Sequence, residues 1–473
     1  MPARTGFRLT RRTALLLLAV LAALAVSLWP APAGLTPAAM RALGLLVGAI
    51  ICWAGSVMDD YVVAMFMGVG WIILRVVPFK VAFATFALTN YWMMAGALGV
   101  GVAVAQSGLL RRVALLTLRA LPPTFAGQVA GLVGAGVMLG PTLPSVVGKT
   151  AIAGKFVLGI HEAMGLQDRS AHSTGLYMAM LLGFGTMGPL FMSGTVTNFV
   201  ILGLLPAEVK ANITWISWFV TYLPTMLVIL ALSLLAVLVV CRPQRVVPLS
   251  REYLSGELAA LGPLSRSERI TLATLSVTLL LWVTGQWHGI DAATVALTAV
   301  AFLSAVGIID RSAFQSKIAW SAMMFMGFAL NLAQVFPYLK IDAWLGTKIL
   351  PVFAPLTARP AVFFGALMLM VVLIRQIMVS WDATITIVML ILSPAVAAVG
   401  INPWTVGIAT HLVAQVCWIL PFQHNAYAVS HQAADERLAD QRRATLLSLI
   451  SIAIVMLAVE ASLPWWRLRG LLP

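Results

Sequence analysis

The feature that most constrains this chain is a series of long apolar runs. Eleven of them come close to the roughly 20 residues that an α-helix needs to cross a bilayer. Only 10% of the 473 residues are charged, against about 25% in soluble domains. This excludes soluble enzymes and secreted domains, which need a polar surface. The sequence predicts an all-α polytopic membrane protein with spans at 13–30, 39–57, 61–77, 83–107, 174–205, 213–241, 270–288, 292–309, 318–338, 402–430 and 443–462.

The net charge of +14 comes from basic residues grouped between the apolar runs, without aromatic residues interleaved on one face. That pattern argues against a nucleic-acid partner and follows the positive-inside rule, by which short cytoplasmic loops carry Lys and Arg. A cytoplasmic N-terminus places every basic cluster inside, as in a bacterial-type inner (plasma) membrane. The clusters lie at 4–12, 111–119, 242–269, 311–317 and 442–443. Because the first run is long and Pro32 weakens the following cleavage-like site, a retained first helix is favoured over a cleaved signal.

Two further apolar stretches, 120–160 and 349–398, are too long for one helix and are interrupted by Pro, Gly or charge. All basic clusters lie on the cytoplasmic side only if the first stretch enters the membrane from that side and returns to it. The second must then enter and leave on the outer side. The sequence therefore predicts about 11 transmembrane helices plus two opposed re-entrant hairpins.

The two halves of the chain repeat one order of features. In each half, a Trp near the end of one span precedes a span that begins with an acidic residue. An interrupted apolar stretch follows. A second break comes after it, at 194–198 in one half and 421–425 in the other. An odd number of crossings separates the halves, which indicates an inverted-topology repeat. The predicted parts are 1–38 (N-terminal segment and first helix), 39–241 (first repeat), 242–269 (cytoplasmic linker) and 270–473 (second repeat).

The breaks predict a polar cavity, because irregular backbone inside a membrane survives only against protein or water. Pro141 and Pro144 cannot continue a helix, and a new helix beginning near Ser145 presents free N–H groups and a positive dipole end. Such helix N-termini bind carboxylate, sulfate or phosphate. Backbone carbonyls in unwound helical segments suit a dehydrated cation such as sodium. An anion and a cation bound side by side form the simplest symport site.

Each of three charged residues near the breaks has two possible roles. Lys149 is either an anion contact or a side chain that reaches the cytoplasmic interface. Asp382 either binds a cation or proton or, like Ser380, caps the second hairpin helix. Arg375, two helical turns earlier, either pairs with Asp382 or meets the substrate.

The polar residues of the second breaks also have alternatives. Asn198 and Asn425 hold equivalent positions, where each offers ligand atoms or bonds its own backbone. His424 either titrates near neutral pH or packs through hydrogen bonds.

These features resemble the divalent anion–sodium symporter (DASS) family. The resemblance covers most of the chain after the first helix and rests on the order of elements and on five local strings. The strings are 107–115, 144–145, 194–198, 380–384 and 400–403. It implies a homodimer with a scaffold and a mobile transport domain that moves as an elevator. It also implies dicarboxylate, citrate or sulfate substrates, usually coupled to sodium. Of the family's Ser-Asn-Thr signature at the two tips, only Ser145 and Ser380 are present.

We therefore expect a secondary active transporter (symporter) of a small anion, coupled to sodium or protons. It is not an enzyme and carries no cofactor, since no catalytic or metal-ligand motif is present. The alternative is a cation–proton antiporter without an organic substrate, for which Asp382 and Arg375 would suffice. The predicted substrate contacts are Thr142, Ser145, Lys149, Arg375, Ser380 and Thr384. The predicted coupling residues are Asp382, Asn198, Asn425, Thr195 and His424. The sequence leaves open which anion is carried and in which direction.

Overall fold

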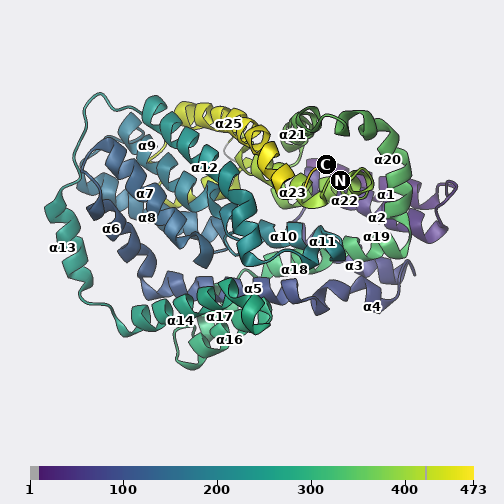
Figure 1. The fold of residues 1–473 in the computed structure, drawn as a ribbon, viewed down its shortest axis with the longest axis horizontal. Coiled ribbons are helices and arrows are strands. Elements are labelled where there is room, and N and C mark those ends of the chain that lie inside the picture. The colour runs from purple at the N-terminus through teal and green to yellow at the C-terminus, as the bar shows by residue number, and fades with distance from the viewer. Residues whose placement is uncertain (1–9, 421–422) are drawn as a thin grey trace, which may run out of the picture.

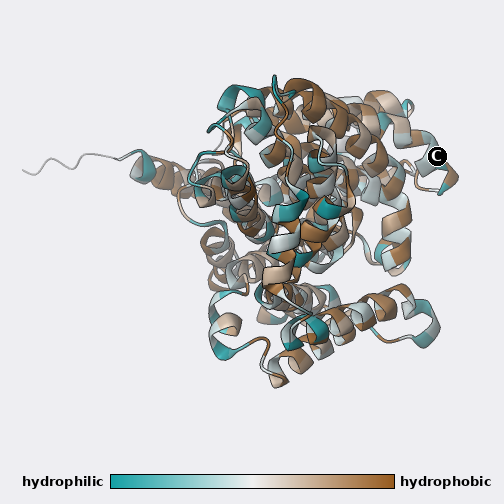
Figure 2. Ribbon diagram, turned by 90° about the vertical axis from the view of Figure 1, so that its left-hand side faces the viewer, coloured by the Kyte–Doolittle hydropathy of each residue, from teal (hydrophilic) through white to brown (hydrophobic). Residues whose placement is uncertain are grey.

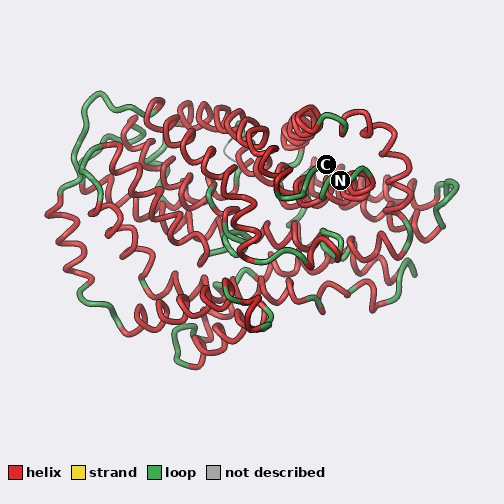
Figure 3. The backbone as a smooth tube through the Cα atoms, viewed as in Figure 1, coloured by secondary structure: helices red, strands yellow, loops and turns green. Residues whose placement is uncertain are grey.

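The computed structural model describes residues 10–420 and 423–473, and these residues form helices and no strands. Figure 3 shows helices joined by loops throughout. The all-α prediction is confirmed. The arginines at positions 4 and 8 of the first basic cluster, and positions 421–422 of the second break, lie outside the described residues.

Seven helices are long and apolar enough to cross a membrane, and the number rises to nine if each of two bent pairs forms one span. Apolar ribbon predominates along these helices, as Figure 2 shows, while polar residues gather at helix ends and loops. The seven are α1 (Arg11–Leu28), α2 (Pro37–Ala54), α7 (Phe125–Leu139, with the turn that follows), α12 (Trp215–Val240), α21 (Pro360–Ile377), α22 (Trp381–Ala398) and α25 (Gln441–Leu468). The bent pairs are α5 (Thr89–Ser107) with α6 (Leu109–Ala120), and α18–α19 (Trp320–Ala329 and Leu332–Tyr338) with α20 (Ile341–Thr357).

The difference from the eleven predicted spans has local causes. Two predicted spans, 174–205 and 402–430, are broken helices, so neither half is long enough alone. Two others are the short apolar helices α3 (Asp60–Ile73) and α16 (Ala292–Ala305). The first turn of α14 (Arg266–Val283) carries three charged residues.

The first predicted hairpin stretch, 120–160, is interrupted as expected. The helix α7 ends at Leu139, a short 3₁₀ turn follows at Gly140–Thr142, and α8 runs from Val146 to Ala163. The Ser145 hydroxyl caps α8 by accepting a hydrogen bond from the Gly148 N–H at 3.1 Å. The following broken helix consists of α9 (Ala171–Met180), η3 (Leu181–Thr186), η4 (Gly188–Leu190) and α10 (Val196–Leu204).

The second predicted stretch, 349–398, needs a correction at its start. Residues 349–357 belong to α20, which continues through Pro351 and Pro355. The interrupted pair is therefore α21 and α22, broken at 378–380. The following broken helix consists of α23 (Pro403–Val416) and α24 (Asn425–Ala433), so the order of the first half recurs.

Helices of the two repeats pack against each other around the breaks. The helix α8 lies along α24, and α10 lies along α22. Figure 1 shows α8 beside α7 on the left of the molecule, and α10 and α22 to the right of its middle. The helix that follows each predicted hairpin break thus meets the broken helix of the other half. The shorter helices are α4 (Phe79–Ala82), η1 (Ala84–Ala87), α11 (Ala207–Ala211), α15 (Gly285–His288) and α17 (Arg311–Ser316).

The predicted linker, 242–269, contains the helix α13 (Arg251–Leu261) and the start of α14. Arg112 of α6 holds this linker to the first repeat. Its Nε donates to Glu268 at 2.6 Å, and its Nη1 donates to the Gly262 carbonyl at 3.0 Å.

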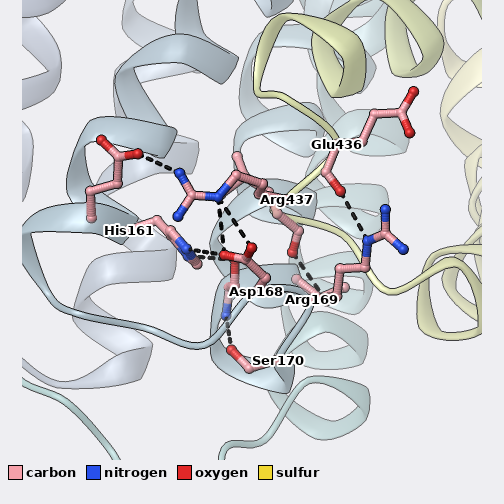
Figure 4. Close-up of polar contacts among 10 residues, drawn as sticks. His161, Asp168, Arg169, Ser170, Glu436 and Arg437 are labelled. Carbon is pink, nitrogen blue, oxygen red and sulfur yellow. Dashed lines mark hydrogen bonds and ion pairs between the residues drawn. The ribbon is translucent and has the colours of Figure 1, made fainter.

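A polar cluster joins the end of α8 to the segment between α24 and α25 (Figure 4). The Nε of Arg437 donates to both carboxylate oxygens of Asp168 at 3.2 Å, and a second nitrogen pairs with Glu162. The ring of His161 hydrogen bonds to Asp168 at 3.0 Å and to Ser173 at 2.9 Å. The cluster fastens the first hairpin to the broken helix of the second half.

Replacing Arg437 with Ala should lower the thermal unfolding midpoint by only about 1–2 °C, because its partners are exposed to solvent. The hydrogen bond from Arg437 holds the pKa of Asp168 below its ordinary value. The stabilising effect of a depressed pKa is present above the unfolded value and is lost as pH falls through the folded value. Unfolding scans should therefore show the difference near pH 7 and a smaller one in acid. Arg442→Ala, at an exposed arginine two residues into α25, is the control.

Candidate functional site

A cavity of about 1210 Å³ lies where the two hairpin breaks meet the start of α10. Both breaks contribute the first turn of the helix that follows them. The link between α2 and α3 and the start of α18 also line the cavity. The lining residues used below are Arg12, Trp53, Asp59, Asp60, Ser145, Val146, Val147, Thr195, Thr197, Ser380, Trp381, Asp382 and Asn425.

Two helix N-termini in this cavity keep free donors. In α8 and α22 the first two N–H groups have no acceptor among the described residues. The third N–H of each helix is already bound by the Ser145 or Ser380 hydroxyl. Free N–H groups and the positive dipole ends of two helices form an anion-binding arrangement.

The charged side chains of the cavity have the opposite sign. Three carboxylates (Asp59, Asp60 and Asp382) and one guanidinium (Arg12) line it, which gives 1 − 3 = −2 when all are ionised. Asp382 accepts a hydrogen bond from the Thr197 hydroxyl at 2.7 Å, and Asp60 interacts with Ser380. An anion in this cavity would therefore meet backbone N–H groups and hydroxyls, beside carboxylates that would repel it when ionised.

The predicted substrate contacts divide into two groups. Ser145 and Ser380 line the cavity, and each caps its helix. Thr142 and Thr384 are buried outside the lining, where their hydroxyls donate to the carbonyls of Leu139 and Ser380 at 2.8 and 2.9 Å. The two threonines therefore satisfy local backbone and do not face the cavity.

Lys149 follows neither of its two predicted readings. Its side chain is 2% exposed, so it does not reach an interface, and it is not part of the cavity lining. Its Nζ donates to the carbonyl of Gly194, in the unwound segment before α10, at 2.9 Å. Local sequence patterns do not indicate this contact, because the acceptor lies 45 residues away.

Arg375 also differs from both predictions. It is fully buried in α21, forms no ion pair with Asp382 and does not line the cavity. Its guanidinium donates to backbone carbonyls of three segments that end at breaks. The acceptors are Ala414 at 3.0 Å, Gln423 at 2.8 Å, Met378 at 2.5 Å, and Val379.

The predicted coupling residues of the first half lie at the start of α10. Thr195 caps this helix and lines the cavity. Asn198 is fully buried, and its Nδ2 donates to the carbonyls of Phe191 and Met192 at 2.8 and 3.3 Å, so it closes its own helix break. Its Oδ1 is buried and has no hydrogen-bond partner among the described residues.

The predicted coupling residues of the second half occupy different surroundings. Asn425 is exposed and lines the cavity. His424 caps α24, since its Nδ1 accepts from the Tyr427 N–H at 2.9 Å, and its ring contacts Trp381 and Trp418. An Nδ1 that accepts a hydrogen bond carries no proton, so the cap holds this histidine in a neutral form.

Three cavity residues were not selected from the sequence. They are Asp59, Asp60 and Thr197. Asp59 makes no side-chain capping bond in α3. The signal available in the sequence was the adjacent acidic pair, which is unusual so close to an apolar run.

A second cavity of about 1170 Å³ lies at the other ends of the same helices. The first cavity meets α10 at Thr195–Thr197, and the second meets it at Leu202–Leu204. Likewise α22 begins in the first cavity and reaches the second at 389–397. From Thr197 to Leu202 the helix rises by about 8 Å, which is the distance between the two hollows along α10.

Comparison with known proteins agrees with this architecture. A family model described as the sodium:sulfate symporter transmembrane region matches residues 10–472. A membrane protein of Cupriavidus necator is 26% identical over 69% of this chain and 68% of its own length. The chloroplastic dicarboxylate transporter 2 of Spinacia oleracea is 24% identical over 67% of this chain. The match spans 57% of the spinach protein, which is less than two thirds of its length.

The fold is also found among solved structures. Neisseria gonorrhoeae MtrF, described as illuminating a class of antimetabolite efflux pumps, aligns with a TM-score of 0.55 at 15% sequence identity. The alignment covers 95% of this chain and 93% of that one. This likeness concerns the fold.

Proposed function

Because the chain belongs to the sodium:sulfate symporter family, we propose that it carries a small dicarboxylate, citrate or sulfate, bound in the cavity between the two hairpin breaks. The observation that carries this proposal is the meeting of two capped helix N-termini, α8 and α22, at one hollow. Four free backbone N–H groups and the hydroxyls of Ser145 and Ser380 match the acceptor oxygens of such anions. Relatives named as dicarboxylate transporters support the same substrate class.

The carboxylates of the cavity favour a proton as the coupling ion. Asp382 is the candidate carrier, because it lies at the α22 N-terminus where the anion binds and contacts Thr197 of the other repeat. The ionisable groups that act on it are Asp60 across the cavity and Arg375 behind the break. A protonated Asp382 removes one negative charge beside the anion, so that proton binding and anion binding strengthen each other.

The two cavities support alternating access. Arg12, the α2–α3 link and the start of α18 line the first cavity, and all three lie on the cytoplasmic side of the predicted topology. The proposed state is therefore open to the cytoplasm, with the re-entrant hairpins opposed and α10 and α22 as the barrier. Movement of these elements as an elevator, a homodimeric scaffold and an inner-membrane location complete the proposal, and the family resemblance supports them.

Uptake into proteoliposomes tests the function. Purified protein should accumulate labelled succinate, malate, citrate or sulfate when the outside is acidic, and an unlabelled form of the same anion should compete. Counterflow of these anions separates the proposal from the cation–proton antiporter. An antiporter would exchange external cations for internal protons, and so raise the pH inside the vesicles, without moving any of the four anions. Absence of counterflow for all four anions would contradict the proposed substrate class.

A further inference from the structure

Two buried cations lie at the two places where broken helices leave backbone carbonyls without helical partners. Lys149 bonds the unwound segment of the first repeat, and Arg375 bonds the break residues of the second. Neither side chain reaches the cavity, and neither forms an ion pair among the described residues. Their positive charges are thus compensated by carbonyl oxygens.

The carbonyl that Lys149 bonds belongs to a glycine, Gly194, that is surrounded by other backbone oxygens. A Cβ placed on Gly194 would lie 2.2 Å from the Gly188 oxygen, 3.1 Å from the Phe191 oxygen and 3.2 Å from the Gly140 oxygen, so these three oxygens surround Gly194. The Lys149 Nζ donates to the Gly194 oxygen at 2.9 Å and lies 3.5 Å from where a Gly188 Cβ would be. The ammonium therefore lies against Gly188 and bonds the Gly194 carbonyl of the same unwound segment.

The second cluster is larger and is filled by a larger cation. Carbonyls from the end of α21, from α23 and from the second unwound segment converge on the guanidinium of Arg375. The four acceptors come from positions 378, 379, 414 and 423. Arg375 precedes its break whereas Lys149 follows its own, so the two cations reach comparable clusters from different positions of the repeat.

Unwound carbonyls of this kind coordinate sodium in transporters built from inverted repeats. We propose that Lys149 and Arg375 are tethered cations that take the place of coupling sodium ions, so that this transporter works without sodium. A tethered ammonium supplies the same single positive charge, and a sodium ion entering beside it would meet strong repulsion at low dielectric. The tethered charge is never released, so it holds the carbonyl clusters together in every state but provides no driving force. This inference rests on the proposed function for its transport readout only.

The first test measures sodium binding without any substrate. Thermal unfolding of the purified protein is compared in NaCl, KCl and choline chloride at equal ionic strength. Wild type should show the same midpoint in all three. Lys149→Ala should unfold at a lower temperature in KCl and recover by about 2 °C or more in NaCl, because the vacated carbonyl cluster then binds sodium. Lys155→Ala, at an exposed lysine of the same helix, should behave as wild type. Lys149→Met, which keeps the aliphatic stem, replaces Lys149→Ala if that variant does not fold.

The second test measures transport. Replacing external sodium with choline should change the initial uptake rate of wild type by less than about twofold, whereas a required coupling ion would change it by more than tenfold. A sodium-specific midpoint shift in wild type, or a tenfold sodium dependence of its uptake, would overturn the inference. So would a lack of sodium stabilisation in both Lys149 variants. If no anion is transported under any condition, the proposed function fails while the unfolding experiment still decides the sodium question.

Discussion

Asp382→Asn should abolish proton-driven accumulation of the anion while leaving exchange of bound anion intact. The asparagine keeps the size of the side chain and an oxygen that accepts the 2.7 Å hydrogen bond from Thr197, but it cannot bind and release a proton. Accumulation driven by a pH gradient should fall by at least about tenfold, the effect of about 1.4 kcal/mol of lost coupling. Counterflow in the absence of a gradient should stay within about twofold of wild type.

Asp59→Asn is the matched control. It removes a carboxylate from the same cavity, but one that is exposed and makes no side-chain capping bond. Anion accumulation by the Asp59→Asn variant should keep the pH dependence of wild type. Wild-type pH dependence in Asp382→Asn would contradict the coupling role. Equal loss of accumulation and counterflow would instead make Asp382 part of the anion site.

Arg375→Ala should be the most destabilising single change in the second repeat. It removes four hydrogen bonds and leaves buried carbonyls from three segments without a donor. At about 1–3 kcal/mol for each unsatisfied group, the loss is at least about 4 kcal/mol. We expect a large fall in folded yield and in the thermal unfolding midpoint, measured in detergent. Arg375→Lys should recover only part of it, because one ammonium has three donors and lacks the flat fork of the guanidinium.

Arg359→Ala provides the comparison on the same helix. Arg359 precedes α21 and is exposed, so its removal should change stability by about 0.5 kcal/mol or less. A midpoint for Arg375→Ala within error of the Arg359→Ala midpoint would show that water or other donors satisfy the four carbonyls.

The elements that the sequence predicted well are those set by short-range rules. The prolines at 141 and 144 end one helix, and Ser145 and Ser380 cap the next, whatever surrounds them. The same local reasoning failed at α20, where Pro351 and Pro355 suggested part of the hairpin but the helix continues through both.

The partners of the charged residues could not be predicted from local rules. Lys149 and Arg375 bond carbonyls 45 and 48 residues away, at Gly194 and Gln423. Which carbonyls lack a backbone N–H donor depends on how the broken helices of both halves pack. The order of side chains along the sequence does not indicate this packing. Asp60 belongs to the site only because α3 faces the start of α22, which is again a matter of tertiary packing.

The short α10 between the two hollows has an electrical consequence. If water fills both hollows, each takes the potential of its own side of the membrane, and the field is concentrated across the remaining thickness of about 8 Å. A charge that crosses this layer then experiences nearly the whole membrane voltage, about 2.3 kcal/mol per 100 mV. The net charge moved in one transport cycle therefore decides how strongly the resting membrane potential drives or opposes transport.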